Sequence, residues 1–233
     1  PSTAARTVTW IGNDGTAASA AVTSTINISA VNNAPVLTAG GTLSYPENAA
    51  ATAIDNTITL SDVDSATLSS ATAQITTNCV NPQDVLSFTN QNGITGVYTA
   101  ASCLMTLTGS SSLANYQTAL RSVRYNNTSA NPSTAARMVT WIGNDGTAAS
   151  TAVTSTINIS AVNSAPVLTA GGTLSYAENA AATAIDNTIT VSDVDSANLS
   201  SATAQITTNC VNPQDVLSFT NQNGITGAYT AAS

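Results

Sequence analysis

The chain contains no lysine and no histidine, and its only basic residues are 4 arginines among 233 residues. With a formal net charge of −8 it has no basic surface to neutralise phosphate groups, which excludes nucleic-acid binding. The absence of histidine excludes Ser-His and Cys-His catalytic pairs and imidazole ligands for zinc. A glycosidase that pairs Glu47 with an aspartate is formally possible, but 4% aromatic residues do not suggest a sugar-binding cleft. We therefore predict that the chain is not an enzyme.

Long apolar runs are also missing. No segment approaches the roughly 20 consecutive apolar residues that a helix needs to span a bilayer, so we expect no membrane insertion in this segment. The sequence is dominated by alanine, threonine, serine, asparagine and glycine, and threonine alternates with valine as in β-strands. A hydrophobic content of 42% is sufficient for a packed core.

An internal repeat is the strongest pattern that is present. The phrase PSTAARTVTWIGNDGTAAS at Pro1 returns with one change at Pro132, an offset of 131 residues. Residues 1–102 and 132–233 differ only at the pairs Thr7/Met138, Ala20/Thr151, Asn33/Ser164, Pro46/Ala177, Leu60/Val191, Thr67/Asn198 and Val97/Ala228. This period is far longer than the ~20–50 residues of solenoid units, so each copy is expected to be a whole domain.

The phrases AVNNAPV and AVNSAPV mark the expected domain boundaries, because a proline follows a short polar linker in each. They predict the C-terminal part of one repeat in residues 1–33, a complete repeat in 34–164 and the N-terminal part of a following repeat in 165–233. The chain then represents a segment of a longer array.

Short alternating segments separated by turn residues predict an all-β domain of the β-sandwich type. The expected strands are 36–45, 57–61, 71–77, 84–89, 94–99, 103–108, 121–126, 137–142 and 152–160. One short helix is expected after the cap residue Ser112, where Leu113, Tyr116 and Leu120 have helical spacing, and it should cross from one sheet to the other. Val139 and Trp141 alternate with a threonine and are expected in the core.

The cysteines are few, and two of them fall in the complete repeat. A Cys79–Cys103 disulfide would stabilise the domain by about 3 kcal/mol in the loop-entropy model and would indicate an oxidising compartment. Two buried thiols in separate strands are the alternative. Cys210 is the copy of Cys79.

Asp62 and Asp64 are conspicuous in a chain with so few charges, and SDVDS recurs at Asp193 and Asp195. If strand 36–45 runs from the entry end to the exit end, successive strand reversals place Asp62, Asp64 and Asp145 together at the entry end and Glu47 at the exit end. Oxygen ligands without histidine or thiolate are typical of Ca²⁺ sites. Ordinary solvated turns rich in aspartate are the alternative.

The phrases SYPENAAATAI, ITLSDVDSATLSSATAQI and IGNDGTAASAAVTSTINISAVNNAPV resemble the cadherin-like tandem repeats of very large bacterial surface and RTX-type adhesins. The resemblance covers the whole repeat, including LANYQTALRSVRYNNTSANPSTAAR. It implies tandem cadherin- or immunoglobulin-like β-sandwich domains joined end to end, with Ca²⁺ bound between neighbouring domains. Carried onto the matching positions, it implies these ligands and their copies in the repeat: Glu47, Asp62, Asp64, Asp145, Asn32, Asn163, Glu178, Asp193, Asp195 and Asp14.

This sequence departs from the family pattern at two places. Asn33 and Ser164 stand where the family linker carries an acidic residue, and the middle of the repeat has no counterpart of the family's DRE motif. Both departures imply fewer or weaker ions at each junction.

The sequence predicts a structural spacer, the stiff stalk of an extracellular bacterial adhesin or surface fibre, whose partners are the neighbouring repeats. The first alternative is a subunit of a polymeric filament or surface layer, with lateral self-association. The second is a carbohydrate- or ice-binding module, which would need a flat row of exposed threonines or an aromatic platform. Tyr98, Tyr116 and Tyr125 are scattered and do not suggest such a platform.

Overall fold

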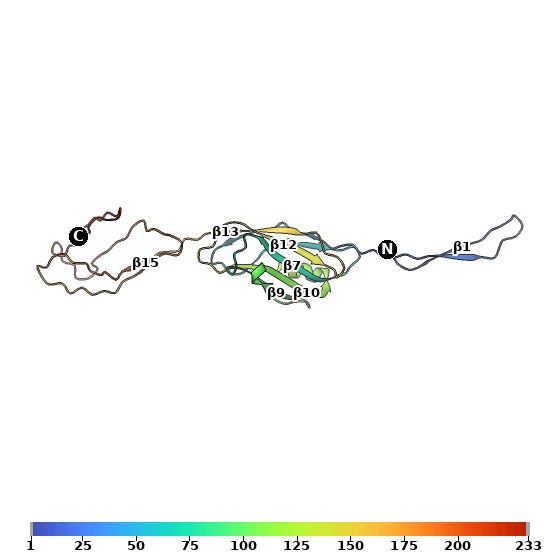
Figure 1. The fold of residues 1–233 in the computed structure, drawn as a ribbon, viewed down its shortest axis with the longest axis horizontal. Coiled ribbons are helices and arrows are strands. Elements are labelled where there is room, and N and C mark those ends of the chain that lie inside the picture. The colour runs from blue at the N-terminus through green and yellow to red at the C-terminus, as the bar shows by residue number, and fades with distance from the viewer. Residues whose placement is uncertain (1, 232–233) are drawn as a thin grey trace. The chain divides into compact units, whose positions relative to one another are not determined.

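The computed structural model of the protein describes residues 2–231. Within this range the regular structure is almost entirely β-strand, with one α-helix, α1 (Leu113–Arg121), and one short 3-10 turn, η1 (Ala100–Ser102) (Figure 1). The predicted all-β class with one short helix is confirmed. The chain forms two compact units, one ending at Val162 and the other beginning at Asn163. The division into parts of three repeats stays a prediction.

None of the helices in the described part of the chain is long and apolar enough to cross a membrane.

The largest sheet of the first unit has six strands. Its strands, in spatial order, are β4 (Thr42–Pro46), β13 (Val153–Ser160), β12 (Arg137–Asn144), β7 (Thr67–Thr77), β10 (Leu104–Ser112) and β9 (Thr95–Thr99). Neighbouring strands pair antiparallel, except β4 and β13, which are parallel with Pro46 opposite Ser160. The last strand of the repeat, β13, is therefore hydrogen-bonded beside its second strand, β4.

The remaining strands of the complete repeat form two smaller sheets. One consists of β5 (Thr52–Ala53), β11 (Arg124–Asn127) and β8 (Asp84–Ser87), and the other pairs β3 (Val36–Thr38) with β6 (Thr59–Ser61). The prediction of a single strand over 36–45 is wrong, because β3 and β4 belong to different sheets. Between them the backbone N–H groups of Gly40 and Gly41 donate to Asp55, and a Cβ at Gly41 would lie 2.5 Å from the Asp55 carboxyl carbon.

Helix α1 connects the two larger sheets, as predicted, because it follows β10 and precedes β11. The Ser112 hydroxyl accepts a hydrogen bond from the N–H of Asn115 (3.2 Å), so this residue is the expected N-cap. Tyr116 and Leu120 are fully buried on the inner face of the helix. The predicted strand 121–126 begins only at Arg124, because α1 continues to Arg121.

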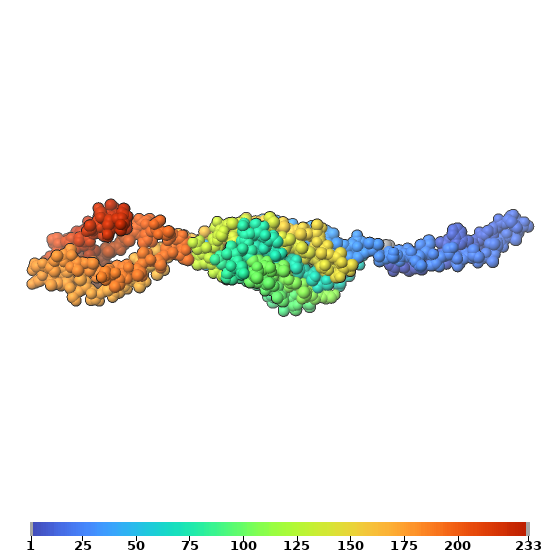
Figure 2. All heavy atoms as spheres, in the orientation of Figure 1, coloured from blue at the N-terminus to red at the C-terminus, as the bar shows by residue number. Residues whose placement is uncertain are grey.

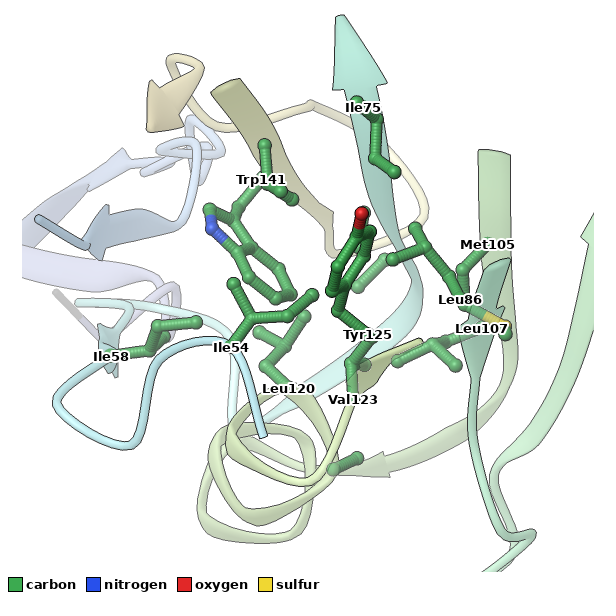
Figure 3. Packing of buried hydrophobic residues seen from close by; sticks show 14 of the residues in the cluster. Ile54, Ile58, Ile75, Leu86, Met105, Leu107, Leu120, Val123, Tyr125 and Trp141 are labelled. Carbon is green, nitrogen blue, oxygen red and sulfur yellow. The ribbon is translucent and has the colours of Figure 1, made fainter. Parts of the chain in front are cut away.

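The core of the complete repeat gathers apolar side chains from both larger sheets and from α1 (Figure 3). Val139 and Trp141 are both fully buried, which confirms their predicted position. Tyr45 and Tyr125, from different sheets, meet edge to face with ring centroids 4.9 Å apart. Burial of each large apolar side chain contributes about 1.5–3 kcal/mol to stability.

The predicted disulfide between Cys79 and Cys103 is present. It links residues 24 apart in sequence. In the loop-entropy model, a cross-link over a loop of this length stabilises the folded domain by about 3 kcal/mol. Cys210 is free and half-buried.

Asp55 is a buried carboxylate that ties the turn at Gly40 to the core. Its oxygens accept hydrogen bonds from the Thr57 N–H and hydroxyl and from the Ser155 hydroxyl (2.6 Å), in addition to the two glycine N–H groups. The Ser155 hydroxyl in turn accepts the indole N–H of Trp141. Burial opposes ionisation, yet these donors together hold the pKa of Asp55 well below its ordinary value.

The lowered pKa of Asp55 predicts an acid-sensitive fold. Because its pKa is lower in the folded state than the ~3.9 of an unfolded aspartate, its contribution is complete above about pH 4 and is lost as the pH falls through the folded pKa. We expect Asp55→Asn to lower the free energy of unfolding at pH 7 by about 1.5–3 kcal/mol, because an amide group replaces an oxygen that accepts N–H donors. The free energy of unfolding of the variant should also vary less with pH, as measured by urea denaturation between pH 2 and 7. Asp186→Asn, at the copy of Asp55, is the control and should leave the unfolding of the complete repeat unchanged.

The flanking copies of the repeat have much less structure than the complete one. Residues 6–26 form a hairpin of β1 (Arg6–Trp10) and β2 (Val22–Ile26), and the second unit contains only β14 (Val167–Thr169) and β15 (Thr190–Ser192) as paired strands in its described part. The atoms of the second unit, orange to red in Figure 2, leave open gaps, whereas the body of the complete repeat is continuous. Nearly identical sequence therefore has different structure according to which strands accompany it.

Candidate metal centre

Three aspartates meet at the entry end of the complete repeat. Asp62 and Asp64 lie in the turn after β6, and Asp145 follows the last residue of β12. The pairing of Asn144 with Ser70 puts the end of β12 beside the start of β7, just after the Asp62 turn. The strand directions inferred from the sequence are therefore correct, and the negative charge of Asp145 acts on Asp62.

The carboxylates at this end are held by local backbone N–H groups. Asp62 Oδ1 accepts the N–H groups of Asp64 (3.0 Å) and Ser65 (2.9 Å), and Asp145 Oδ1 accepts those of Thr147 and Ala148. Burial and the charge of Asp145 oppose ionisation of Asp62, but its N–H donors outweigh them and lower its pKa. The N–H of Ala148 and then the Asn32 amide lower the pKa of Asp145. Asp62 and Asp145 therefore both carry charge at neutral pH.

The linker before the complete repeat joins this cluster. The Asn32 side-chain amide donates to Asp145 Oδ2 (2.8 Å), and the backbone N–H of Asn33 donates to Asp64 Oδ2 (2.9 Å). Both contacts connect residues far apart in sequence, so the linker is tied to the two aspartate turns. The structure thus brings together Asn32, Asp62, Asp64 and Asp145, as the sequence predicted.

The second unit repeats part of this arrangement. The N–H of Ser164 donates to Asp195 Oδ2 (2.6 Å), and the N–H groups of Asp195 and Ser196 donate to Asp193 Oδ1. The Asn163 side chain donates to the carbonyl of Ser164. The linker–aspartate contact is therefore a property of the repeat rather than of one copy.

Glu47 lies at the other end of the complete repeat. It follows β4, and its N–H donates to the carbonyl of Ser160 (3.0 Å) at the end of β13, opposite to the end that carries Asp145. The residue is only 4% exposed. Neither carboxylate oxygen has a hydrogen-bond partner among the described residues. Its copy, Glu178, is exposed.

Unsatisfied buried atoms provide a test of whether these residues suit a cation. In residues 2–231, the buried side-chain nitrogen and oxygen atoms without a hydrogen-bond partner are Oε1 and Oε2 of Glu47, Oδ2 of Asp62 and Nη2 of Arg137. Three of these four atoms are carboxylate oxygens of predicted calcium ligands. A buried carboxylate oxygen without a donor is costly, and a hard cation is a partner that would satisfy it.

No group of three or more acidic, histidine or cysteine side chains in the described part of the chain is arranged so that it could hold a metal ion. Asn32 donates to Asp145 through its side-chain NH₂ group rather than contacting it with its oxygen. Asp64 Oδ2 already accepts a hydrogen bond from the backbone N–H of Asn33. Asp14, the copy of Asp145, accepts the N–H groups of Thr16 and Ala17 in its own turn. The calcium ligand set therefore stays a prediction.

A second polar cluster, around Asp84, was missed from the sequence. Asp84 is fully buried and forms an ion pair with Arg137 (Nε to Oδ2, 3.2 Å). Its Oδ1 accepts the Tyr125 hydroxyl and the Asn127 amide, and its Oδ2 accepts the N–H of Val80. Burial, followed by the hydrogen bond to Asp84, raises the pKa of Tyr125. The available signal was a single charged residue at the start of each of two otherwise uncharged strands.

Comparison with protein-family models gives no match for this chain, and no curated protein is significantly similar to it.

Proposed function

We propose that the chain is a spacer segment of tandem β-sandwich repeats in a long extracellular bacterial adhesin or surface fibre, stiffened by Ca²⁺ at the domain junctions. The single observation that carries the calcium part is the buried, unpartnered carboxylate oxygens of Glu47 and Asp62. The hydrogen bonds of the linker residues Asn32 and Asn33 to the aspartate turns add support, because they hold the linker against the carboxylate cluster.

In this proposal Asp62, Asp64 and Asp145 hold the cation at the entry end with Asn32, whose amide would turn its oxygen inward. Asn163, Asp193 and Asp195 are the corresponding residues of the second unit. The ion would neutralise carboxylates that repel each other and would fix the linker. The extracellular location is supported by the disulfide, since such bonds persist in oxidising compartments.

Near-identical copies favour a spacer over a receptor-binding module, because a spacer requires length rather than a distinct chemistry in each copy. The outward face of the six-stranded sheet carries threonines such as Thr72, Thr106 and Thr140 and no charged side chain at its strand positions. This uncharged face favours lateral association, so a filament or surface-layer subunit is the second candidate. Tyr116 and Tyr125 are buried in the core and provide no aromatic platform.

The calcium proposal predicts a large difference in stability between calcium and chelator. At a free calcium concentration 100 times the dissociation constant, binding stabilises the folded repeat by about 2.7 kcal/mol. We expect the melting temperature of the complete repeat, followed by calorimetry, to rise in calcium, and Asp145→Asn to abolish the rise. Asp14→Asn removes a charge from the equivalent turn outside the cluster and should leave the rise unchanged.

The chelated state provides a further readout for the same variants. There Asp145→Asn should lower the melting temperature modestly, because the turn's N–H groups and the Asn32 amide stabilise the charged carboxylate, and this loss is measured separately from the loss of the calcium-dependent rise. Equal melting temperatures in calcium and chelator for the unsubstituted chain would leave these aspartates as ordinary turns.

A further inference from the structure

The loops of the complete repeat, all of which the structure describes, carry no basic side chain. The chain has no lysine, and the three arginines of this repeat lie at the end of α1, at the start of β11 and at the start of β12. The connecting segments consist mainly of small, uncharged residues, as in TSANPSTAA between β11 and β12. Exposed loops of this kind are the preferred sites of proteolytic cleavage in folded proteins. Proteases of the trypsin type cleave after lysine or arginine, and these loops offer them neither.

Arg121 is held by the end of the helix. Its Nε donates to the carbonyl of Ile58 (2.7 Å), and the next N–H, of Ser122, donates to carbonyls within α1. Leu120 and Val123 on either side are 0% exposed. A protease binds several residues around the cleaved bond in an extended conformation, so these residues must first leave their own secondary structure. Cleavage after Arg121 therefore requires the end of α1 to unwind and two core side chains to become exposed.

Arg124 and Arg137 are protected by the sheets. Arg124 is exposed, but it lies in β11, which is hydrogen-bonded to β5 on one side and to β8 on the other. Its neighbour Tyr125 is 0% exposed. Arg137 is itself 0% exposed and is paired with Asp84. Neither bond can enter a protease active site while the two sheets are intact.

The large aromatic side chains of the complete repeat are also kept out of its exposed loops. Phe88 is the one that lies outside a strand or helix there, and it packs against the core. The others belong to regular elements: Tyr45, Tyr98, Tyr116, Tyr125 and Trp141. Proteases of the chymotrypsin type, whose specificity pocket is a hydrophobic slot, therefore also lack an exposed aromatic residue in these loops.

We propose that the composition of its loops makes the folded repeat resistant to proteases that require a basic or a large aromatic side chain. The property adds to the spacer function a means of persisting where such proteases are secreted. It does not depend on that function or on calcium, because it concerns the fold of a single repeat. Proteases that accept alanine are outside the proposal, since alanine is common in the loops.

Digestion of the full 233-residue chain with trypsin, followed by mass spectrometry, tests the proposal against a control within the chain. Arg6 and Arg137 both follow the sequence PSTAA, but Arg6 is exposed in the β1–β2 hairpin, and an isolated hairpin is marginally stable. We expect rapid cleavage after Arg6, which leaves residues 7–233 intact. Cleavage after the other three arginines should be about 10³-fold slower or more, because it waits for the unfolded fraction. After reduction and heat denaturation, all four sites should be cleaved at similar rates.

A matched pair of variants separates the composition of the loops from their rigidity. Thr134 is exposed in the loop between β11 and β12, and Thr154 is exposed in β13, which is hydrogen-bonded on both sides. We expect trypsin to cleave Thr134→Lys at position 134 about as fast as after Arg6. Thr154→Lys should resist cleavage at position 154, although the residue change and the added charge are the same. Thr134→Phe and Thr154→Phe provide the same comparison for chymotrypsin, and thermal unfolding verifies that each variant is folded.

Three results would overturn the proposal. Cleavage of the unsubstituted chain after Arg121, Arg124 or Arg137 as fast as after Arg6 would show that the fold does not protect these bonds. A folded Thr134→Lys chain that trypsin leaves intact at position 134 would show that rigid loops, and not their composition, provide the resistance. Equal cleavage at positions 134 and 154 in the two lysine variants would show that the sheet itself opens to the protease.

Discussion

Asp84→Ala is expected to lower the free energy of unfolding of the complete repeat by about 3–5 kcal/mol, because it leaves the buried charge of Arg137 without a counter-ion. Arg137 Nη1 donates to the carbonyls of Ser133 and Ala135 and Nη2 lacks a partner among the described residues, so only neutral acceptors would remain for the buried charge. The variant also removes the acceptor of the Tyr125 hydroxyl and the Asn127 amide. These losses act in one network, and their effects will not be additive.

Urea denaturation followed by circular dichroism measures this loss. Asp215→Ala is the matched control, because Asp215 has the same local sequence but no arginine partner in the described structure, and it should change the main transition little. The double variant Asp84→Leu with Arg137→Met should recover part of the stability, since an apolar pair carries no desolvation cost. Equal stability of Asp84→Ala and the unsubstituted chain would contradict a buried ion pair.

Trp141→Ala is expected to destabilise the complete repeat by about 3–5 kcal/mol, through lost apolar burial and the cavity that remains. The side chain is fully enclosed, and its indole N–H leads through Ser155 to Asp55, so the substitution also loosens the buried carboxylate. Thermal unfolding should show a lower midpoint with a smaller enthalpy.

The chain contains its own control for this substitution. Trp10 occupies the same local sequence in the hairpin but is largely exposed, so Trp10→Ala should leave the midpoint of the complete repeat unchanged at low protein concentration. Similar losses from the two substitutions would mean that Trp10 is buried in solution.

The sequence predicts most of the strands of the complete repeat, because threonine and apolar residues alternate with the period of a strand. Val139 and Trp141 were placed in the core by this alternation alone, and Ser112 with Leu113, Tyr116 and Leu120 was sufficient to place α1. The disulfide followed from the presence of two cysteines in one repeat. These features depend on neighbours within a few residues or on simple counting.

The features that were missed depend on contacts across the fold. The Gly40–Gly41 pair is the local signal within 36–45 for the separation of β3 from β4. The contact that fixes this turn comes from Asp55, which lies 15 and 14 residues beyond the two glycines whose N–H groups it accepts. The pairing of Asp84 with Arg137 joins residues 53 apart. The meeting of Asp62, Asp64 and Asp145 was predicted only because strand direction could be counted from both ends of the repeat.

The parallel pairing of β4 with β13 has a mechanical consequence for a chain that is pulled at both ends. Tension enters the complete repeat near β3 at one end and leaves through β13 at the other, so it acts along the strands. Because β13 is hydrogen-bonded between β4 and β12, pulling on it loads both ladders in shear, with many bonds strained at once rather than opened one after another. A repeat connected in this way resists force far better than one whose last strand could be peeled from an edge.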